Sequence, residues 1–158
     1  MKKSRYRSDL TTDEKVLMAL VRAAENFKRV HSAIFRKHGL SFPQYNILRV
    51  LEASEAGQNK ISTVGKIMLV PGANMTGLAK RMERDGFILR KSDPADERVT
   101  LLEITRKGRD SLKKIEKAKD AAVDVILKGL TKQDKVVLLD RIKHIIRTTG
   151  HLQKNAED

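Results

Sequence analysis

Residues 73–84 hold side chains suited to contact with nucleic acid. On a helix of about 3.6 residues per turn, small or short polar side chains come first on one face, and basic ones follow. Short side chains let a helix backbone approach base edges, while lysine and arginine neutralise phosphates. This face comprises Ala73, Asn74, Thr76, Gly77, Lys80, Arg81 and Arg84. The alternative is an ordinary solvated face on a surface helix.

The elements around this face form a helix-turn-helix pattern. The other face of the same helix, which runs to Asp85 and is closed by Gly86, carries an apolar stripe at helical spacing. A shorter helix, Ser62–Leu69, precedes it with Ser62 as a possible N-cap. Val70-Pro71-Gly72 separates the two helices, because proline and glycine end one helix and let another begin at a new angle. The stripe consists of Met75, Leu78, Ala79 and Met82.

A β-hairpin follows the second helix. Two β-prone runs, Phe87–Ser92 and Val99–Ile104, are separated by the polar turn Asp93–Arg98. Such a hairpin would act as a wing, with cations beside the basic helix and Asp96 orienting the neighbouring arginines. Ser62 and Thr63, at the start of the shorter helix, complete the candidate DNA-binding set. The cations of the hairpin are Arg90, Lys91 and Arg98.

Three segments resemble the MarR family of bacterial winged-helix regulators. They are Lys80–Ile88, at the end of the second helix, the wing tip Asp96-Glu97-Arg98, and Leu102–Gly108, where the chain leaves the hairpin. The resemblance implies an obligate dimer and a repressor released by a small, often aromatic and anionic ligand between the dimer helices and the DNA-binding lobe. Some members also sense zinc. Many members have arginine where this chain has Gly77, so the base contacts of that arginine do not carry over.

Composition supports a basic, helical protein. The 158 residues correspond to one domain, and 40% hydrophobic but only 4% aromatic residues predict a core of Leu, Ile, Val, Met and Ala. With 33 basic against 20 acidic residues, the net charge of +13 favours a polyanionic partner. Nucleic acid is the first candidate and a membrane surface the second. No apolar run approaches the roughly 20 residues of a spanning helix, and we expect a cytoplasmic protein.

The N-terminal segment predicts a long helix and a second, shorter one. Residues 1–9 form a basic arm, either solvated or in contact with DNA. Thr11 and Glu14 form a capping box ahead of a helix to about Lys37. Ser41 and Gln44 begin the next helix, and residues 55–60 form a loop before the helix-turn-helix. The wide apolar stripe of the first helix comprises Val16, Leu17, Leu20, Val21, Ala24, Phe27, Ile34 and Phe35.

Two further helices follow the hairpin. Residues 105–128 form a polar helix with a thin apolar seam, and Thr131 with Asp134 begins a last helix whose tail frays from Gly150. The expected fold is mainly α with a small β-hairpin wing. It is a single MarR-like domain over residues 1–158, with a winged-helix lobe at 41–105. Helices at 10–38 and 106–150 would pair with a second copy to form a homodimer, or would form an intramolecular bundle.

No constellation predicts catalysis, since the chain has no phosphate loop, nucleophile motif or paired carboxylates in an apolar setting. Zero cysteines exclude disulfides and thiolate chemistry in this chain. His31 and His38, like His144 and His151, are two helical turns apart, too far to chelate one ion, so we expect surface or second-shell histidines; a metal site assembled from several helices is the minor alternative. The sequence predicts no cofactor and no enzyme. It predicts a homodimeric, sequence-specific double-stranded DNA binder; the alternative is a sequence-indifferent basic nucleic-acid binder.

Overall fold

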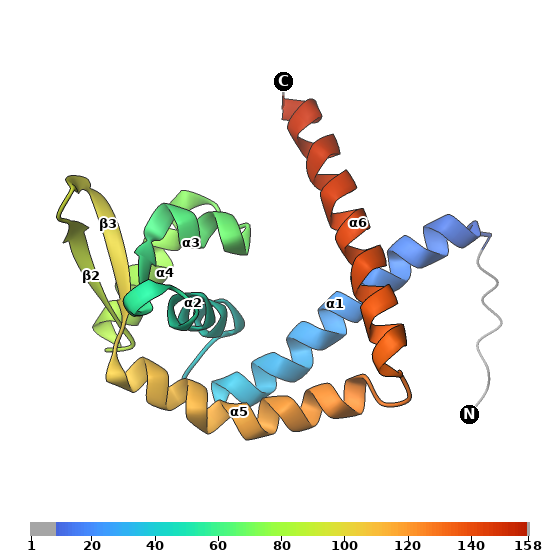
Figure 1. Ribbon diagram of the computed structural model, residues 1–158, viewed down its shortest axis with the longest axis horizontal. Coiled ribbons are helices and arrows are strands. Elements are labelled where there is room, and N and C mark those ends of the chain that lie inside the picture. Colours follow the sequence, from blue (N-terminus) through green and yellow to red (C-terminus); the bar gives the residue numbers. More distant parts are fainter. Residues whose placement is uncertain (1–8, 158) are drawn as a thin grey trace. The chain divides into compact units, whose positions relative to one another are not determined.

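The computed structural model describes residues 9–157 and is mainly α-helical, as the sequence predicts (Figure 1). Most of the expected basic arm, residues 1–8, lies outside the described residues. The elements are α1 (Thr12–Arg36), α2 (Phe42–Glu52), a short 3-10 turn (Glu55–Gly57), β1 (Gln58–Lys60), α3 (Ile61–Met68), α4 (Gly72–Arg84), β2 (Ile88–Asp93), β3 (Asp96–Ile104), α5 (Arg106–Ile126) and α6 (Lys132–Glu157).

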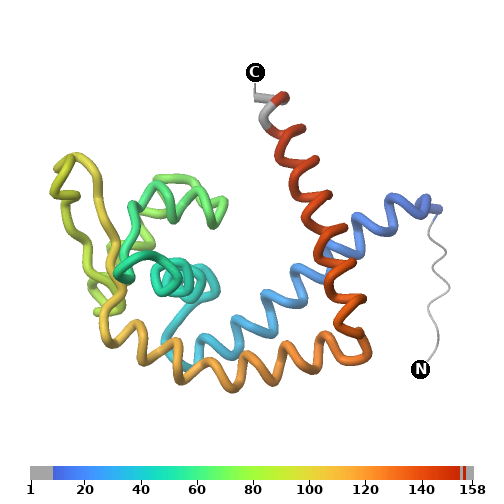
Figure 2. Tube along the Cα trace, in the orientation of Figure 1, coloured from blue at the N-terminus to red at the C-terminus, as the bar shows by residue number. Residues whose placement is uncertain are grey.

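The described chain divides into two compact units. The first runs up to Ala122 and includes α1 to β3 and most of α5 (Figure 2). The second starts at Val123 and contains the end of α5 and α6. The helix-turn-helix and the hairpin both belong to the first unit, so the candidate DNA-binding residues occupy one compact body.

All three predicted capping patterns are present at helix starts. The Thr11 backbone N–H donates to Glu14 Oε2 at 2.7 Å, and the Glu14 N–H donates to Thr11 Oγ1 at 3.2 Å. Ser41 with Gln44 repeats this reciprocal pair at α2, and Thr131 with Asp134 at α6. Each box satisfies N–H groups that the helix itself leaves without acceptors, which fixes where the helix begins.

Two local predictions are wrong. Helix α6 continues to Glu157 rather than fraying from Gly150, because one glycine costs a helix only about 1 kcal/mol. The expected loop at residues 55–60 contains strand β1, which pairs antiparallel with β3, Asn59 opposite Leu102. The sheet is therefore three-stranded, in the order β1-β3-β2. The polar run Gln58-Asn59-Lys60 carries no alternating pattern, so only the partner strand reveals it.

The core of the first unit joins α1 and α5 to the winged-helix lobe. Aliphatic residues dominate it, as predicted, but three of the chain's few aromatics are also buried: Phe35, Tyr45 and Phe87. Phe35 of α1 stacks on Tyr45 of α2 with ring centroids 3.9 Å apart. The aliphatic part comprises Leu40, Ile47, Leu48, Leu51, Val64, Met75, Ala79, Met82, Ile88, Leu102, Ile104, Leu112 and Ile115.

Candidate nucleic-acid interface

The helix-turn-helix is built from α3 and α4. Leu69 ends α3 in a left-handed conformation (φ 53°, ψ 41°), where its N–H donates to Lys66 O at 3.2 Å. The Val70 N–H donates to Gly65 O at 3.0 Å, which closes the helix end with the paired bonds of a Schellman motif. Pro71 then precedes the first residue of α4. The predicted break is therefore confirmed, with Leu69 as the residue that turns the chain.

The N-cap expected at Ser62 is wrong. Helix α3 begins at Ile61, its N-cap is Lys60, and no side chain caps it. Ser62 lies within the first turn with its side chain exposed, and Thr63 is half-buried. Strand β1 delivers the chain directly into this helix, so pairing with β3 sets the start of α3 in place of a side-chain cap.

Helix α4 has an inner face packed into the core and an outer face exposed to solvent. Met75, Ala79 and Met82 are buried, and Leu78 is half-buried, which matches the predicted stripe. Gly77 is partly exposed, and the Thr76 hydroxyl donates to Gly72 O at 3.2 Å within the helix. The exposed residues of the outer face are Ala73, Asn74, Thr76, Lys80, Arg81 and Arg84.

The predicted closure of α4 at Gly86 is confirmed. Gly86 has φ +79°, and its N–H donates to Glu83 O while that of Phe87 donates to Met82 O, both at 2.9 Å. Glycine adopts this left-handed conformation without steric cost. The chain then enters β2, so the end of α4 and the base of the wing are adjacent (Figure 1).

The wing has a tighter tip than expected. Asp93 pairs with Asp96 across a two-residue turn, Pro94-Ala95, whereas the sequence predicted a six-residue turn from Asp93 to Arg98. Strand β3 therefore includes Arg98. At its tip, Asp96 Oδ1 accepts from the Arg98 N–H at 3.1 Å and lies 3.4 Å from Arg98 Nε. The Arg98 side chain is 94% exposed and projects from the strand with its carboxylate partner beside it.

Asp93, which the sequence places in the polar turn, is only 9% exposed. The Ala95 N–H donates to its Oδ1 at 3.0 Å, and Lys60 Nζ lies 3.4 Å from its Oδ2. The hydrogen bond from Ala95 holds the pKa of Asp93 below its usual value; burial opposes this shift and Lys60 assists it. The ion pair between Lys60 and Asp93 also connects the wing tip to the start of α3, because Lys60 is the N-cap of that helix.

A second contact fastens the wing to α4. The Arg90 N–H donates to Glu83 Oε1 at 3.0 Å, and Arg90 Nη1 lies 3.6 Å from Glu83 Oε2. The Arg90 side chain is only 26% exposed, and its Nε is buried. Arg90, a candidate phosphate contact by sequence, therefore joins β2 to α4. Together with Lys60–Asp93, it fixes the direction of the wing relative to the helix-turn-helix.

The remaining candidate cations differ in their partners. Arg84 Nε lies 3.0 Å from Asp85 Oδ1, and Lys91 Nζ pairs with Glu103 across the hairpin. Within residues 9–157, Lys80 and Arg81 have no carboxylate at salt-bridge distance. These two are the cations that α4 presents without an internal counter-charge, and contact with a phosphate costs them no existing ion pair.

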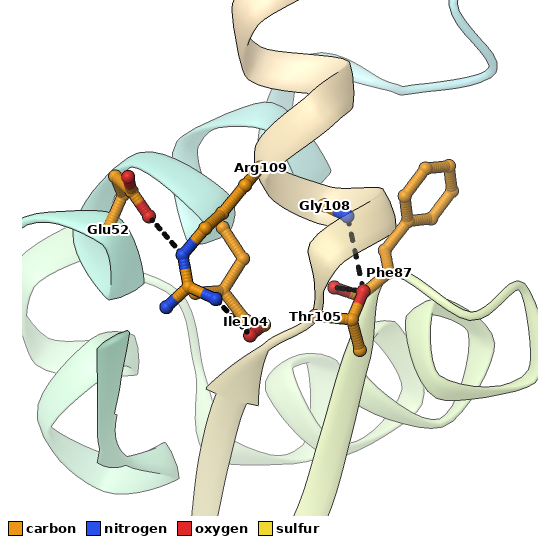
Figure 3. Close-up of polar contacts among 6 residues, drawn as sticks. All are labelled: Glu52, Phe87, Ile104, Thr105, Gly108 and Arg109. Carbon is orange, nitrogen blue, oxygen red and sulfur yellow. Dashed lines mark hydrogen bonds and ion pairs between the residues drawn. The ribbon is translucent and has the colours of Figure 1, made fainter. Parts of the chain in front are cut away.

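Sequence reasoning missed a polar junction at the base of the wing (Figure 3). Arg109 of α5 donates from Nε to Glu52 Oε2 at 3.1 Å and from Nη1 to Ile104 O at 3.3 Å. Thr105 caps α5, since its Oγ1 accepts from the Gly108 N–H at 3.1 Å, and it donates to Phe87 O at 3.0 Å. The junction ties α2, β3, α5 and Phe87, the residue before β2, together. The sequence did contain a signal for this junction, since Thr105 and Gly108 both belong to the segment Leu102–Gly108 that resembles the MarR family.

The histidines do not assemble a metal site in the described part of the chain. No group of three or more His, Asp or Glu residues there is placed to hold a metal ion. His31, expected at a surface or in a second shell, is instead 2% exposed, packed against Phe27 with ring centroids 3.9 Å apart. Its Nδ1 lies 2.9 Å from Phe27 O. Among the helices described, none is long and apolar enough to cross a membrane.

The chain matches a family model and curated relatives. The model, described as transcriptional regulator SarA/Rot, matches residues 29–115, more than half of the chain. The chain is 29% identical over 132 residues to the HTH-type transcriptional regulator TtmR of Methylorubrum extorquens. That alignment covers 82% of this chain and 65% of TtmR, so the chain spans slightly less than two thirds of that relative.

Solved structures share the fold. Sco3205, a MarR family regulator from Streptomyces coelicolor solved in complex with DNA, has a TM-score of 0.81 at 18% identity, over 92% of both chains. NadR, solved with 4-hydroxyphenylacetate, has a TM-score of 0.71 at 20% identity, over 90% of this chain and 97% of NadR. The chain belongs to the SarA/Rot family of transcriptional regulators, which are not enzymes, and it has the fold of the MarR family winged helix-turn-helix regulators.

Proposed function

We propose that the protein is a homodimeric repressor that reads a specific double-stranded DNA sequence and is released by a small ligand. The exposed face of α4, which joins Asn74 and Thr76 to the unpaired cations Lys80 and Arg81, carries the proposal. In this arrangement α4 enters the major groove, where Asn74 and Thr76 reach base edges. Lys80, Arg81 and Arg84 contact phosphates.

The wing supplies the second set of contacts. Arg98 reaches the flanking minor groove, where A·T-rich sequence narrows the groove and strengthens its negative potential. Asp96 holds the Arg98 side chain beside the tip. Lys91 contacts phosphates near the hairpin. Arg90 contributes indirectly, because its ion pair with Glu83 holds the wing against α4. Ser62 and Thr63 support the backbone contacts from the first turn of α3.

The homodimer is supported by apolar side chains that the single chain leaves exposed. Such side chains recur along α1 and α6, and clusters of this kind on soluble proteins mark interaction surfaces. A second copy of the chain is the occupant we propose, by an isologous contact. The exposed residues are Val16, Leu17, Met18, Val21, Phe27 and Val30 on α1, and Val136, Val137, Leu138, Leu139, Ile146 and Leu152 on α6.

Release by a ligand is supported by a pocket between α2 and α5. Its volume of ≈ 220 Å³ suits a one-ring molecule, and its lining combines Tyr45 and Leu112 with the cations Arg49, Lys113 and Lys119 and the carboxylate of Glu116. Arg109 and Glu52 of the polar junction also line it. An anion that drew Arg109 away from Glu52 would disturb the base of β3, because Arg109 also holds Ile104 O. A small aromatic acid therefore fits as the effector.

Binding titrations on a selected operator and on random duplex, each at several salt concentrations, test the DNA-reading role. We expect Lys80→Ala to weaken binding to both duplexes alike and to reduce the slope of log affinity against log salt by about one unit per protomer. Asn74→Ala should leave that slope unchanged but relax preference at one or two operator positions, worth roughly 1 to 3 kcal/mol each.

The same titrations decide against the alternative of a sequence-indifferent basic binder. If random duplex displaces the protein from the operator as readily as the operator itself does, charge alone supplies the affinity and the regulator proposal is wrong. A promoter-reporter assay with and without the protein then establishes repression, and 4-hydroxyphenylacetate and related aromatic acids serve as the first probes of release.

A further inference from the structure

An open hollow lies beside the DNA-reading face of α4. It has a volume of ≈ 450 Å³ and is lined by the turn of the helix-turn-helix, by α4 from Ala73 to Arg81, and by Pro43 of α2. Its polar groups are the side chains of Asn74 and Arg81. The apolar wall consists of Pro43, Leu69, Val70, Pro71, Ala73 and Leu78.

Gly77 keeps this hollow open. Apart from the backbone of its own helix, a Cβ at Gly77 would meet only Arg81 Nη1 within 4 Å, at 3.6 Å, so open space surrounds the outer side of the glycine. Any long side chain at this position would project into the hollow. The absence of a side chain thus leaves an apolar recess on the helix face that the proposed function places in the major groove.

Leu69 forms the exposed edge of the recess. Its side chain is 87% exposed, the largest exposed fraction among the large hydrophobic residues of the described chain. Half-buried Val70 lies next to it. The major-groove edge of B-DNA offers one apolar group, the 5-methyl of thymine, while adenine opposite it offers N6 and N7 to an asparagine side chain. Apolar wall and amide together match the two bases of an A·T pair.

We propose that the recess between Leu69 and Gly77 receives the 5-methyl group of a thymine, while Asn74 contacts the adenine edge. This inference rests on the proposed DNA-reading function and names what that site selects: an A·T pair at the position of each half-site that faces Gly77. Arg81 at the far side of the recess contacts the adjoining phosphate.

Deoxyuridine substitution isolates the methyl group, because uracil keeps the pairing and O4 of thymine and lacks only the methyl. The preferred duplex is first obtained by selection from random sequence with the full chain. Each thymine is then replaced in turn. We expect one position per half-site at which the loss is about fourfold, equivalent to about 0.8 kcal/mol for one buried carbon. Replacement in both half-sites should cost about fifteenfold.

Variants tie this effect to the recess. Leu69→Asn keeps a residue that accepts the left-handed conformation but removes the apolar wall, so the difference between thymine and uracil should disappear. Ile67→Asn is the matched control, because Ile67 is also exposed, at 58%, and does not line the recess. It should keep the fourfold difference. Circular dichroism verifies that both variants are folded.

A methyl-rescue measurement gives an independent reading. At the sensitive position, a C·G pair should weaken binding, and 5-methylcytosine should recover about fourfold of that loss. If no thymine is sensitive while the selected sequence is still preferred over random duplex, the recess does not read methyl groups and only this inference is overturned. If selection returns no preferred sequence, the proposed function itself fails, and this inference fails with it.

Discussion

Gly108 in the first turn of α5 offers a sharp test of how the wing is held. A Cβ at this position would lie 2.6 Å from Phe87 O, 2.8 Å from Ile104 Cγ1 and 3.2 Å from Leu48 Cδ2. The Phe87 carbonyl cannot move away freely, since it accepts from the Thr105 N–H at 3.1 Å and from Thr105 Oγ1 at 3.0 Å. Gly108→Ala therefore forces a backbone shift where β2, β3 and α5 meet.

The size of the effect follows from two opposing terms. Overpacking of this kind costs typically about 1 to 3 kcal/mol. Replacing glycine by alanine in a helix returns roughly 0.5 to 1 kcal/mol. From the middle of each range, the net destabilisation is about 1.25 kcal/mol, and for a chain of this length that lowers Tm by roughly 2.5 to 5 °C. DNA binding should weaken as well, because the displaced strands carry the wing.

Gly77→Ala is the matched control, since a Cβ there meets only Arg81 Nη1 at 3.6 Å. We expect this variant to gain about 0.5 to 1 kcal/mol, so the two substitutions differ in sign. Thermal unfolding by circular dichroism measures both, at one protein concentration because self-association links Tm to concentration. A Gly108→Ala protein as stable as Gly77→Ala would refute the close packing at the base of the wing.

Three further predictions concern the dimer, the wing and pH. Leu138→Asp should dissociate the protein in sedimentation at micromolar concentration, because the carboxylate would enter the proposed interface; a wild-type monomer would contradict the dimer. Arg98→Ala should weaken binding to every duplex, most of all where the operator flanks are A·T-rich, and equal losses on G·C-rich flanks would contradict the minor-groove contact. The hydrogen bond from Ala95 lowers the pKa of Asp93 in the folded protein, so its stabilisation is present above the unfolded pKa and lost as pH falls through the folded pKa. Urea unfolding between pH 3 and 7 should therefore show a smaller acid loss in Asp93→Asn than in the wild type, and identical profiles would contradict that assignment.

Features with a short-range cause could be predicted from the sequence. The capping boxes at Thr11, Ser41 and Thr131 each need residues three apart, and the α4 stripe needs only helical spacing. The closure at Gly86 depends on one residue type at one position. Each pattern lies within about two helical turns, so neighbouring residues alone determine where the helix begins, which face is apolar and where the helix ends.

Features that join distant segments could not be predicted in this way. Lys60 with Asp93, and Arg109 with Glu52, each connect elements well separated along the chain, and charge patterns do not indicate which partners meet. Strand β1 has no alternation of its own and exists because β3 offers a free edge. Such contacts also bear on the candidate site, since Arg90, which the sequence predicts to contact phosphate, forms an ion pair with Glu83.

Leu69 and Gly86 take the same left-handed conformation at the two ends of the DNA-reading region, yet only one is glycine. A leucine in this conformation costs roughly 1 to 2 kcal/mol, and a side chain that is 87% exposed returns little of that cost in the free protein. Stability of the free chain therefore gives no reason for leucine here, whereas burial against a thymine methyl in the complex does. Leu69→Asn should then raise the free energy of unfolding, by up to about 1 kcal/mol, while it lowers discrimination between thymine and uracil. If the variant instead lost stability and discrimination together, Leu69 would serve the turn rather than the DNA.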